Sequence, residues 1–360
     1  MPKPRNRENR ALPRGWRHYH GAYWYRVPEA ARAAWDGRTQ FRLGTTLAEA
    51  HKTFSQRVGE PAGKITTCGQ MLDWYAAFVV PTYKNPRTRA GKLEHIKHLR
   101  PVFADMPVAG FKPAWVYGYV QRRTHKSTGK KALTAAHREV ETLSHAFTKL
   151  VQRGDIDRHP FRDEVRLDGD LALKPRTRYV EDWEVIEALS LAPRRKKGSV
   201  LMCQAYIRVK LLTGLARSDL LRLRLSEHIR DDGIHVTRHK TAETTGKTTI
   251  YEYAQMPERC KAVELAKSVR PALSPYLFCN RRGEGYINEE TGESHGFDSI
   301  WQRFMDRVLA ETKVTCRFTE HDLRAKAGSD AESLEKARAL LQHVDTRTTQ
   351  RIYRRRPERV

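Results

Sequence analysis

A single apolar stripe over residues 133–151 limits most strongly how this chain can fold. Its apolar side chains recur mostly at intervals of three and four residues, and they are Leu133, Ala136, Val140, Leu143, Phe147, Leu150 and Val151. The spacing predicts an amphipathic helix of about five turns, because ~3.6 residues per turn place these side chains on one face. An apolar face of this length has to be covered by other helices, so we expect a helical unit around it.

Helical patterns near residues 67–80, 87–103 and 112–123 supply those partners, and the predicted helical domain covers residues 63–165. Its other faces are rich in Lys, Arg and His. The linker GEPAG at 59–63 precedes it, because glycine and proline interrupt regular structure. We therefore expect a domain boundary at this linker.

Residues 15–54 alternate aromatic, polar and basic side chains (GWRHYHGAYWYRVP, then QFRLGTT) and end in LAEAHKTFSQRV. The pattern predicts a small sheet followed by a helix, in an N-terminal domain of residues 1–62. The aromatic side chains fit either a packed face of the sheet or direct contact with nucleic acid. The two roles are compatible, because a sheet has two faces. The other face would carry Arg17, His18, His20 and Arg26.

A second linker, from about Asp163 to Arg178, contains the turn-like LDGD and leads into a C-terminal domain of residues 176–360. Helical patterns there alternate with one hairpin, GIHVTRHK and KTTIYEY around the polar turn AETTG. Ile234 and Val236 would share one face of it. The predicted fold is multidomain and mainly α, with small β elements.

The charge of the chain points to a nucleic-acid partner. Its 360 residues include 67 Lys and Arg against 42 Asp and Glu, a net charge of +25 and a pI near 10.0. An anionic membrane is the competing partner, but no apolar run approaches the ~20 residues of a membrane-spanning helix. The basic segment PKPRNRENR is not followed by the apolar stretch of a signal peptide. We expect a soluble protein that acts on DNA in the cytoplasm.

The five cysteines indicate neither a disulfide framework nor a zinc module. Their number is odd, no CxxC pair occurs, and they are Cys68, Cys203, Cys260, Cys279 and Cys316. We expect them to be reduced and mostly buried. No Walker loop, HExxH or EF-hand pattern is present, so the sequence carries no signal for a metal or nucleotide cofactor.

Four short stretches of the C-terminal domain place a cation or a proton donor at a defined position. They are LLTGLARSDLLRL at 211–223, Lys240 at the end of the first hairpin strand, FTEHDLRAKAGSDA at 318–331 and QHVDTRTTQRIYRRRPERV at 342–360. In the third, Thr319 and Asp322 predict a capping box at a helix start. His321 and Arg324 would then project from one face, toward a bound anion. Taken alone, such a pair more often belongs to a solvent-exposed helix face than to an anion-binding site.

Together, the four stretches resemble the catalytic domain of the tyrosine recombinases, the phage-integrase family. The resemblance rests on the Thr213–Gly214 turn, on Lys240, and on one pair and two further residues in the family's order: His321 with Arg324, then His343 and Tyr353. More weakly, it extends to the helical domain as a core-site DNA-binding domain and to the N-terminal domain as an arm-site-binding domain. It implies an α+β catalytic domain.

The resemblance also implies a role for each residue. Tyr353 would attack the DNA phosphorus and form a 3′-phosphotyrosyl link, while Arg324 clamps the phosphate. His343 would donate a hydrogen bond to the phosphate, and His321 would assist proton transfer or position the tyrosine. Lys240 would be the general acid. The covalent intermediate conserves the bond energy, so neither metal nor ATP is required.

Other members of this set carry alternatives. Lys247, across the hairpin turn, is the alternative candidate to Lys240 for the general acid. A lysine without this role would be an ordinary solvated charge on the hairpin. Asp219 would orient the first arginine. The family usually has that arginine three residues after the threonine, where this chain has Ala216 followed by Arg217.

Three explanations fit that departure. The helix starts one residue later and Arg217 serves, the chain is a natural variant that depends less on this arginine, or an arginine was replaced by alanine. We favour Arg217. A milder departure is Gln342, where a glycine commonly precedes the second histidine.

The predicted function is a site-specific DNA recombinase, most simply a phage or mobile-element integrase involved in viral genome integration. A type IB topoisomerase would share the chemistry, and a catalytically silent DNA-binding protein would keep only the basic helices. The expected partners are double-stranded DNA at attachment sites, three further copies in a homotetramer on DNA, and possible DNA-bending and directionality proteins. No membrane partner is expected.

Overall fold

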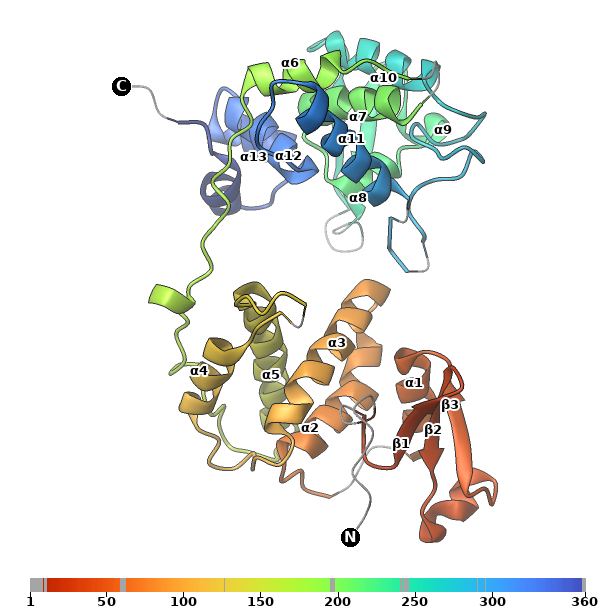
Figure 1. Ribbon diagram of the computed structural model, residues 1–360, viewed down its shortest axis with the longest axis vertical. Helices are drawn as coiled ribbons and strands as arrows, with labels where there is room; N and C mark the ends of the chain where they lie inside the picture. Colours follow the sequence, from red (N-terminus) through yellow and green to blue (C-terminus); the bar gives the residue numbers. More distant parts are fainter. Residues whose placement is uncertain are drawn as a thin grey trace. The chain divides into compact units, whose positions relative to one another are not determined.

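The structure is a computed structural model that describes residues 9, 12–58, 63–125, 127–194, 198–239, 242, 246–289, 291–294 and 296–357. It consists of two compact units, Met1–Lys174 and Pro175–Val360, which are described separately (Figure 1). The unit boundary lies in the predicted second linker. The predicted boundary at residue 62 lies outside the described residues, so two separate domains within the first unit stay a prediction.

The first unit begins with the predicted sheet and helix. Three antiparallel strands lie in the order β1-β2-β3, followed by a helix, with the bounds β1 Trp16–Tyr19, β2 Ala22–Arg26, β3 Gln40–Gly44 and α1 Leu47–Val58. A short helical segment, η2 Glu29–Trp35, joins β2 to β3. Trp16 and Trp35 are buried in a small core under α1, whereas Tyr19 and Trp24 stack outside it at 5.3 Å. One aromatic face is therefore packed, and nucleic-acid contact by the other stays a prediction.

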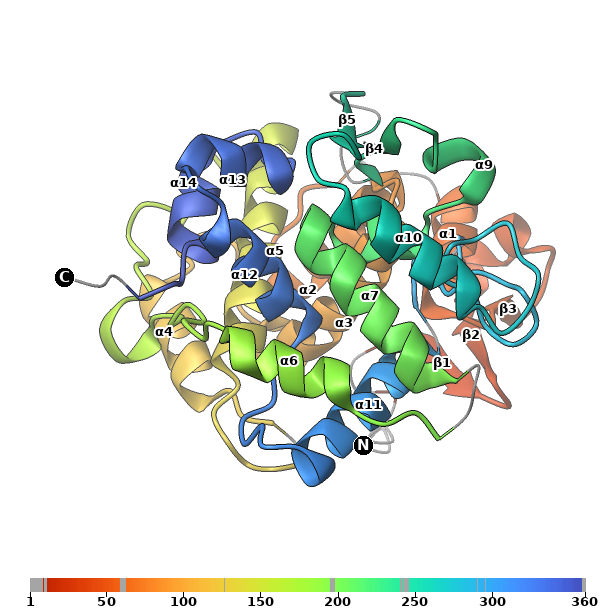
Figure 2. The same cartoon turned by 90° about the horizontal axis from the view of Figure 1, so that it is seen from above.

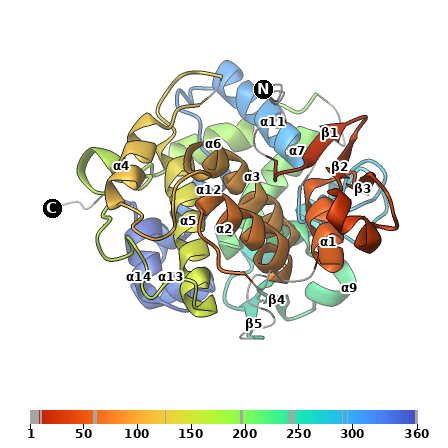
Figure 3. The ribbon, with the colours of Figure 1, turned by 90° about the horizontal axis from the view of Figure 1, so that it is seen from below.

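The helical part of the first unit is built around α5, as the apolar stripe predicts. Its elements are α2 Cys68–Trp74, η3 Tyr75–Val79, η4 Val80–Thr82, α3 Pro86–Phe103, α4 Pro113–Arg122 and α5 Leu133–Arg153. Figure 3 shows α5 beside α2, α3 and α4. The stripe side chains of α5 are buried, from Ala136 through Leu143 and Phe147 to Leu150. The helix stops at Gly154, whose φ of 83° is a left-handed conformation that glycine adopts without strain.

The second unit is a helical domain with one small antiparallel hairpin (Figure 2). Its helices are α6 Asp182–Ser190, α7 Ser199–Thr213, α8 Arg217–Leu221, α9 Leu225–His228, α10 Glu258–Ser268, α11 Phe297–Glu311, α12 Glu320–Asp330, α13 Leu334–Leu340 and α14 Thr346–Thr348. The predicted hairpin is confirmed as β4 Gly233–Thr237 and β5 Thr248–Glu252. A π-helical turn, η7 Thr349–Tyr353, follows α14.

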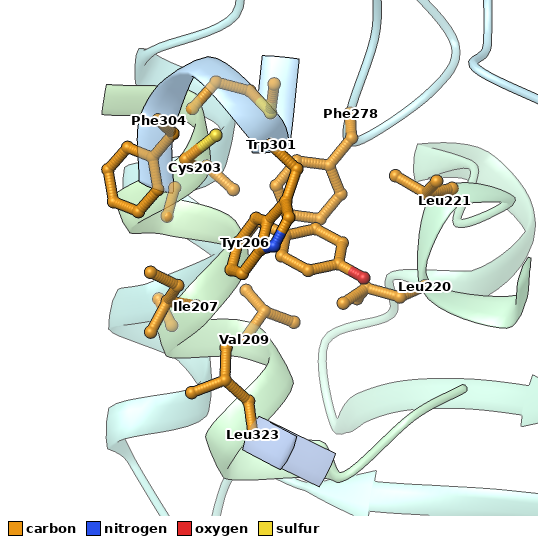
Figure 4. Packing of buried hydrophobic residues seen from close by; sticks show 14 of the residues in the cluster. Cys203, Tyr206, Ile207, Val209, Leu220, Leu221, Phe278, Trp301, Phe304 and Leu323 are labelled. Atoms are coloured by element: carbon orange, nitrogen blue, oxygen red, sulfur yellow. The ribbon is translucent and has the colours of Figure 1, made fainter. Parts of the chain in front are cut away.

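Helix α7 is the centre of this unit. It packs against α10, α11 and α12, and its side chains are apolar on nearly every side, as expected of a helix enclosed by others. Figure 4 shows Tyr206, Ile207 and Val209 of α7 among Phe278 and Trp301. The polar exceptions are informative. Gln204 is satisfied by carbonyl oxygens at the end of α6, whereas Lys210 lies beside the site described next.

The described part of the chain contains no helix that is both long and apolar enough to cross a membrane. Within the same residues, no cluster of three or more His, Cys, Asp or Glu side chains could hold a metal ion. The five cysteines are free, and Cys68, Cys203 and Cys279 are buried.

Candidate active site

The start of α12 positions two of the predicted residues. Thr319 Oγ1 accepts a hydrogen bond from the Asp322 backbone N–H at 3.3 Å, and Asp322 Oδ2 accepts one from the Thr319 N–H at 2.8 Å. This is the predicted capping box, and it fixes the first turn of the helix. His321 is consequently presented at the surface and Arg324 is directed inward.

Arg324 joins three segments that are distant in sequence. Its guanidinium donates hydrogen bonds to the carbonyl of Gly214 at the end of α7, to the carbonyl of Leu341 at 2.6 Å, and to His343 Nε2 at 3.1 Å. The guanidinium carbon lies 5.4 Å from the centre of the Tyr353 ring. Because its donors are held by carbonyl groups, the orientation of the guanidinium is set before any anion binds.

His343 is buried and its tautomer follows from its partners. Arginine can only donate, so Nε2 accepts from Arg324, and the ring proton must sit on Nδ1, 2.9 Å from the Thr349 hydroxyl. Burial, together with Arg324 and Arg238, lowers the pKa of His343 to about 4. The imidazole is therefore neutral near pH 7. Donation to a phosphate, the predicted role, would require the proton to move to Nε2 while Thr349 donates to Nδ1.

Tyr353 lies between the two histidines. Its ring centre is 5.1 Å from that of His321 and 4.8 Å from that of His343, and its hydroxyl is 3.1 Å from His321 Nε2. Partial desolvation of the imidazole by its neighbours lowers the pKa of His321, and Arg355 and Arg324 lower it further. A neutral His321 can accept the phenolic proton, which is what a general base for this tyrosine must do.

The segment that carries Tyr353 is anchored to α12 by contacts that sequence reasoning missed. The Ser329 hydroxyl donates to the Tyr353 carbonyl at 2.6 Å, and Arg355 forms a buried ion pair with Asp322 at 2.9 Å. A Cβ at Gly328 would meet Leu341 Cδ1 at 2.8 Å and Tyr353 Cβ at 3.4 Å, so any larger residue there would have to displace the buried Leu341 side chain. A glycine and a serine together in the last turn of a helix were the available signal.

Arg217 lies at the margin of this cluster. Ala216 is the extended residue just before α8, and Arg217 is the first residue of that helix. The Arg217 guanidinium donates to Asp298 at 2.6 Å, and its Nε lies 3.6 Å from Glu320. The described contacts of Arg217 include neither Arg324 nor Tyr353. Arg217 is thus the first residue of α8, and its role at a phosphate stays a prediction.

The hairpin is held close to the second histidine. Arg238 donates to the Gln342 carbonyl at 3.2 Å, and the Gln342 amide donates to the Val236 carbonyl at 3.3 Å. Asp219 is buried and accepts from the His239 N–H at 3.1 Å, so it holds the backbone next to Lys240. Lys240 itself lies outside the described residues, and its rival Lys247 is exposed.

Comparison with known proteins identifies the fold. No protein-family model and no curated protein matches the sequence. Lambda integrase, as a tetramer bound to a Holliday junction, is 19% identical over 96% of this chain and 97% of that chain, with a TM-score of 0.60. The chain has the fold of an integrase.

Two further integrase structures agree. A lambda integrase dimer on a COC' core site, in a shortened form, is 17% identical over 82% of this chain and 99% of that chain, with a TM-score of 0.63. The Tn1549 transposon integrase in complex with circular intermediate DNA is 15% identical over 80% and 95%, with a TM-score of 0.60. Both integrases are tyrosine recombinases, so the integrase fold confirms the resemblance that the four stretches indicated.

Proposed function

We propose that this chain is a site-specific DNA recombinase of the integrase type, which cleaves and rejoins DNA through a 3′-phosphotyrosyl intermediate. The observation that carries the proposal is the 3.1 Å contact between His321 Nε2 and the Tyr353 hydroxyl, with Arg324 5.4 Å from the same ring. A nucleophile, a base that can take its proton and a fixed cation are the parts that this transesterification needs.

In the proposed cleavage step, Tyr353 oxygen bonds to phosphorus as His321 accepts the phenolic proton. Arg324 stabilises the negative charge that develops on the non-bridging oxygens. The bond from phosphorus to the 5′ oxygen breaks, and a general acid, for which Lys240 is the candidate, protonates the leaving oxygen. Rejoining is the reverse reaction with the 5′ hydroxyl of another strand, which attacks phosphorus and releases Tyr353.

The proposed substrate is double-stranded DNA, in keeping with the net charge of +25. Exchange between two duplexes requires four cleaving subunits, and lambda integrase has been solved as a tetramer on a Holliday junction. We therefore propose that four copies of this chain assemble on DNA. DNA-bending and directionality proteins stay a prediction.

A catalytically silent DNA-binding protein is the second candidate, because Ala216 replaces an arginine that the family usually has. A pool of nicked duplexes with randomised core sequence separates the two. Cleavage beside the nick releases a short fragment and traps the protein on DNA, so a recombinase gives a denaturant-stable adduct and a silent protein gives none. A type IB topoisomerase would also relax supercoiled plasmid without sequence preference.

The matched control for the nucleophile is Tyr253→Phe. The Tyr253 hydroxyl is buried without a hydrogen-bond partner among the described residues, so its removal breaks no such bond. Tyr353→Phe should abolish the adduct and Tyr253→Phe should retain it. Equal trapping by Tyr353→Phe and the parent would show that another residue is the nucleophile.

A further inference from the structure

Lys210 is a buried cation that the mechanism above does not use. Its side chain is 1% exposed within the otherwise apolar helix α7. Its nearest described partner is the Tyr206 hydroxyl at 3.5 Å, a weak contact, and that hydroxyl donates its own proton to Glu320. No carboxylate of the described residues lies within ion-pair distance of the ammonium. Burial of an ammonium group without an ion pair lowers the stability of the fold, so a function of Lys210 has to be considered.

The surroundings of Lys210 are those of the candidate active site. Its carbonyl accepts the N–H of Gly214 at 2.8 Å, and the carbonyl of Gly214 in turn holds Arg324. Burial lowers the pKa of Lys210 to about 7, with Glu320 opposing and Arg324 and Arg217 adding to the effect. The charge of Lys210 is also felt at His321, whose pKa it helps to lower. Lys210, Arg217 and Arg324 thus lie in one electrostatic cluster, in which Glu320 and Asp219 favour the charged form of Lys210.

Lys210 is joined through its backbone to the turn that precedes Ala216, and its charge is coupled to that of Arg324. Ala216 carries no charge, and Arg217 is directed to Asp298 and Glu320. Lys210 and Arg324 are instead connected through Gly214, the glycine of the turn that precedes Ala216. A bound phosphate would relieve the mutual repulsion of these cations and favour the charged form of Lys210.

We propose that Lys210 is a positioning residue that supplies, from beneath the site, the second positive charge that an arginine at Ala216 would supply. The proposal rests on the proposed function, because the charge acts on a DNA phosphate held by Arg324. Lys210 does not contact the reacting atoms in this account. The groups that face it are Tyr206 of α7, Asp219 and Arg217 of α8, and Glu320, His321 and Arg324 of α12.

Stability separates this role from a structural one. The folded-state pKa of Lys210, about 7, lies below the unfolded value of ~10.4, so the unfolded state binds more protons between these values. The penalty for burying the ammonium is therefore full below about pH 7 and fades as the pH rises toward 10. Lys210→Met should raise the melting temperature at about pH 6, and raise it less at about pH 9. A lysine that mainly supports the fold would give a lower melting temperature instead.

The activity test compares Lys210→Met, Lys210→Arg and the double variant Lys210→Met with Ala216→Arg. On a nicked duplex recovered from the randomised pool, Lys210→Met should slow adduct formation by about 10²-fold, as loss of one preorganised charge does. Lys210→Arg should retain most of the rate of adduct formation. Adding Ala216→Arg to Lys210→Met should raise that rate by about tenfold or more. Adduct formation by Lys210→Met at the parent rate would overturn the proposal, and so would a slow Lys210→Met that Ala216→Arg does not improve.

Lys326→Met is the matched control. Lys326 is 4% exposed and lies on the same helix as Arg324, but it pairs with Asp182 and Asp330 on the other side of that helix from the site chemistry. The same substitution there should lower the melting temperature and leave the rate of adduct formation close to that of the parent. A Lys326→Met variant that is as slow as Lys210→Met would assign both effects to loss of buried charge in general and would overturn the specific role.

A probe that needs no cleavage keeps the proposal testable if the parent forms no adduct, which would refute the proposed function. Orthovanadate is a tetrahedral anion like phosphate, and vanadium readily accepts a fifth oxygen ligand, so the bound ion resembles phosphorus in the transition state. It should raise the melting temperature of the parent and of Lys326→Met, and raise that of Lys210→Met much less. An equal rise in all three proteins would show that Lys210 contributes nothing to anion binding.

Discussion

Replacement of Arg355 by methionine should loosen the segment that carries Tyr353. Arg355 Nη1 donates to Asp322 Oδ1 at 2.9 Å and to the Arg178 carbonyl at 3.2 Å, and Nε donates to the Ile352 carbonyl at 2.8 Å. The ion pair is enclosed, because the Arg355 and Asp322 side chains are 5% and 0% exposed. Methionine keeps the aliphatic volume and removes all three hydrogen bonds.

The expected loss of stability in Arg355→Met depends on the contacts that Asp322 keeps. Asp322 keeps its ion pair with Arg176 at 2.7 Å and its two bonds to Thr319, so the substitution does not leave an unpaired buried carboxylate. The cost is then that of hydrogen bonds to a charged group, about 2–3 kcal/mol, rather than the ~3–5 kcal/mol of a fully broken buried pair. For a unit of this size, this corresponds to a drop of about 4–12 °C in melting temperature.

Arg356→Met is the control for this prediction. The neighbouring Arg356 is 59% exposed and lies 3.9 Å from Asp330, and an exposed pair of this kind contributes about 0–1 kcal/mol. Thermal denaturation of both variants, followed by adduct formation on the nicked duplex, measures the difference. The reasoning is refuted if Arg355→Met melts no lower than Arg356→Met, or if it melts lower and still forms the adduct at the parent rate.

Three further predictions concern the histidine, the glycine and the charge of the chain. Because the folded-state pKa of His343 is about 4, below its unfolded value, stability should fall as the pH drops from ~6.5 toward 4, and His343→Gln should flatten this limb in a pH series of denaturant melts. Gly328→Ala should cost about 1–3 kcal/mol of unfolding free energy through contact with Leu341 and Tyr353, whereas Gly91→Ala, in open space, should not destabilise the protein. Equal melting of the two glycine variants would contradict the packing argument. DNA affinity should fall steeply with salt in a filter-binding series, and a flat dependence would count against phosphate contacts by Lys and Arg.

Much of the fold could be predicted from local patterns in the sequence. Three of these patterns depend on residues that are close together in the sequence. They are the apolar stripe of α5, the capping box of Thr319 and Asp322, and the alternation of side chains in β4 and β5. Such patterns can be recognised without tertiary information. The order of the four stretches resembles that of the tyrosine recombinases, and this resemblance is why His321, His343 and Tyr353 could be named before their contacts were known.

The contacts that join those segments could not be predicted. Arg324 is oriented by the carbonyl groups of Gly214 and Leu341, and backbone carbonyl groups leave no trace in residue identity. Lys210 was missed because a lysine in a helical run normally reaches solvent, and only the packing of α7 shows that it does not. The partner of Arg217, Asp298, is equally a product of the tertiary fold.

The most direct test of the central claim is to identify the residue that becomes linked to DNA. Adducts trapped on the nicked pool would be digested with nuclease and protease, and the modified peptide sequenced by mass spectrometry. The proposed chemistry predicts a nucleotide 3′-phosphate on Tyr353, formed by the parent and by Tyr253→Phe and absent from Tyr353→Phe. A phosphate on any other side chain, or an adduct that persists in Tyr353→Phe, would contradict it.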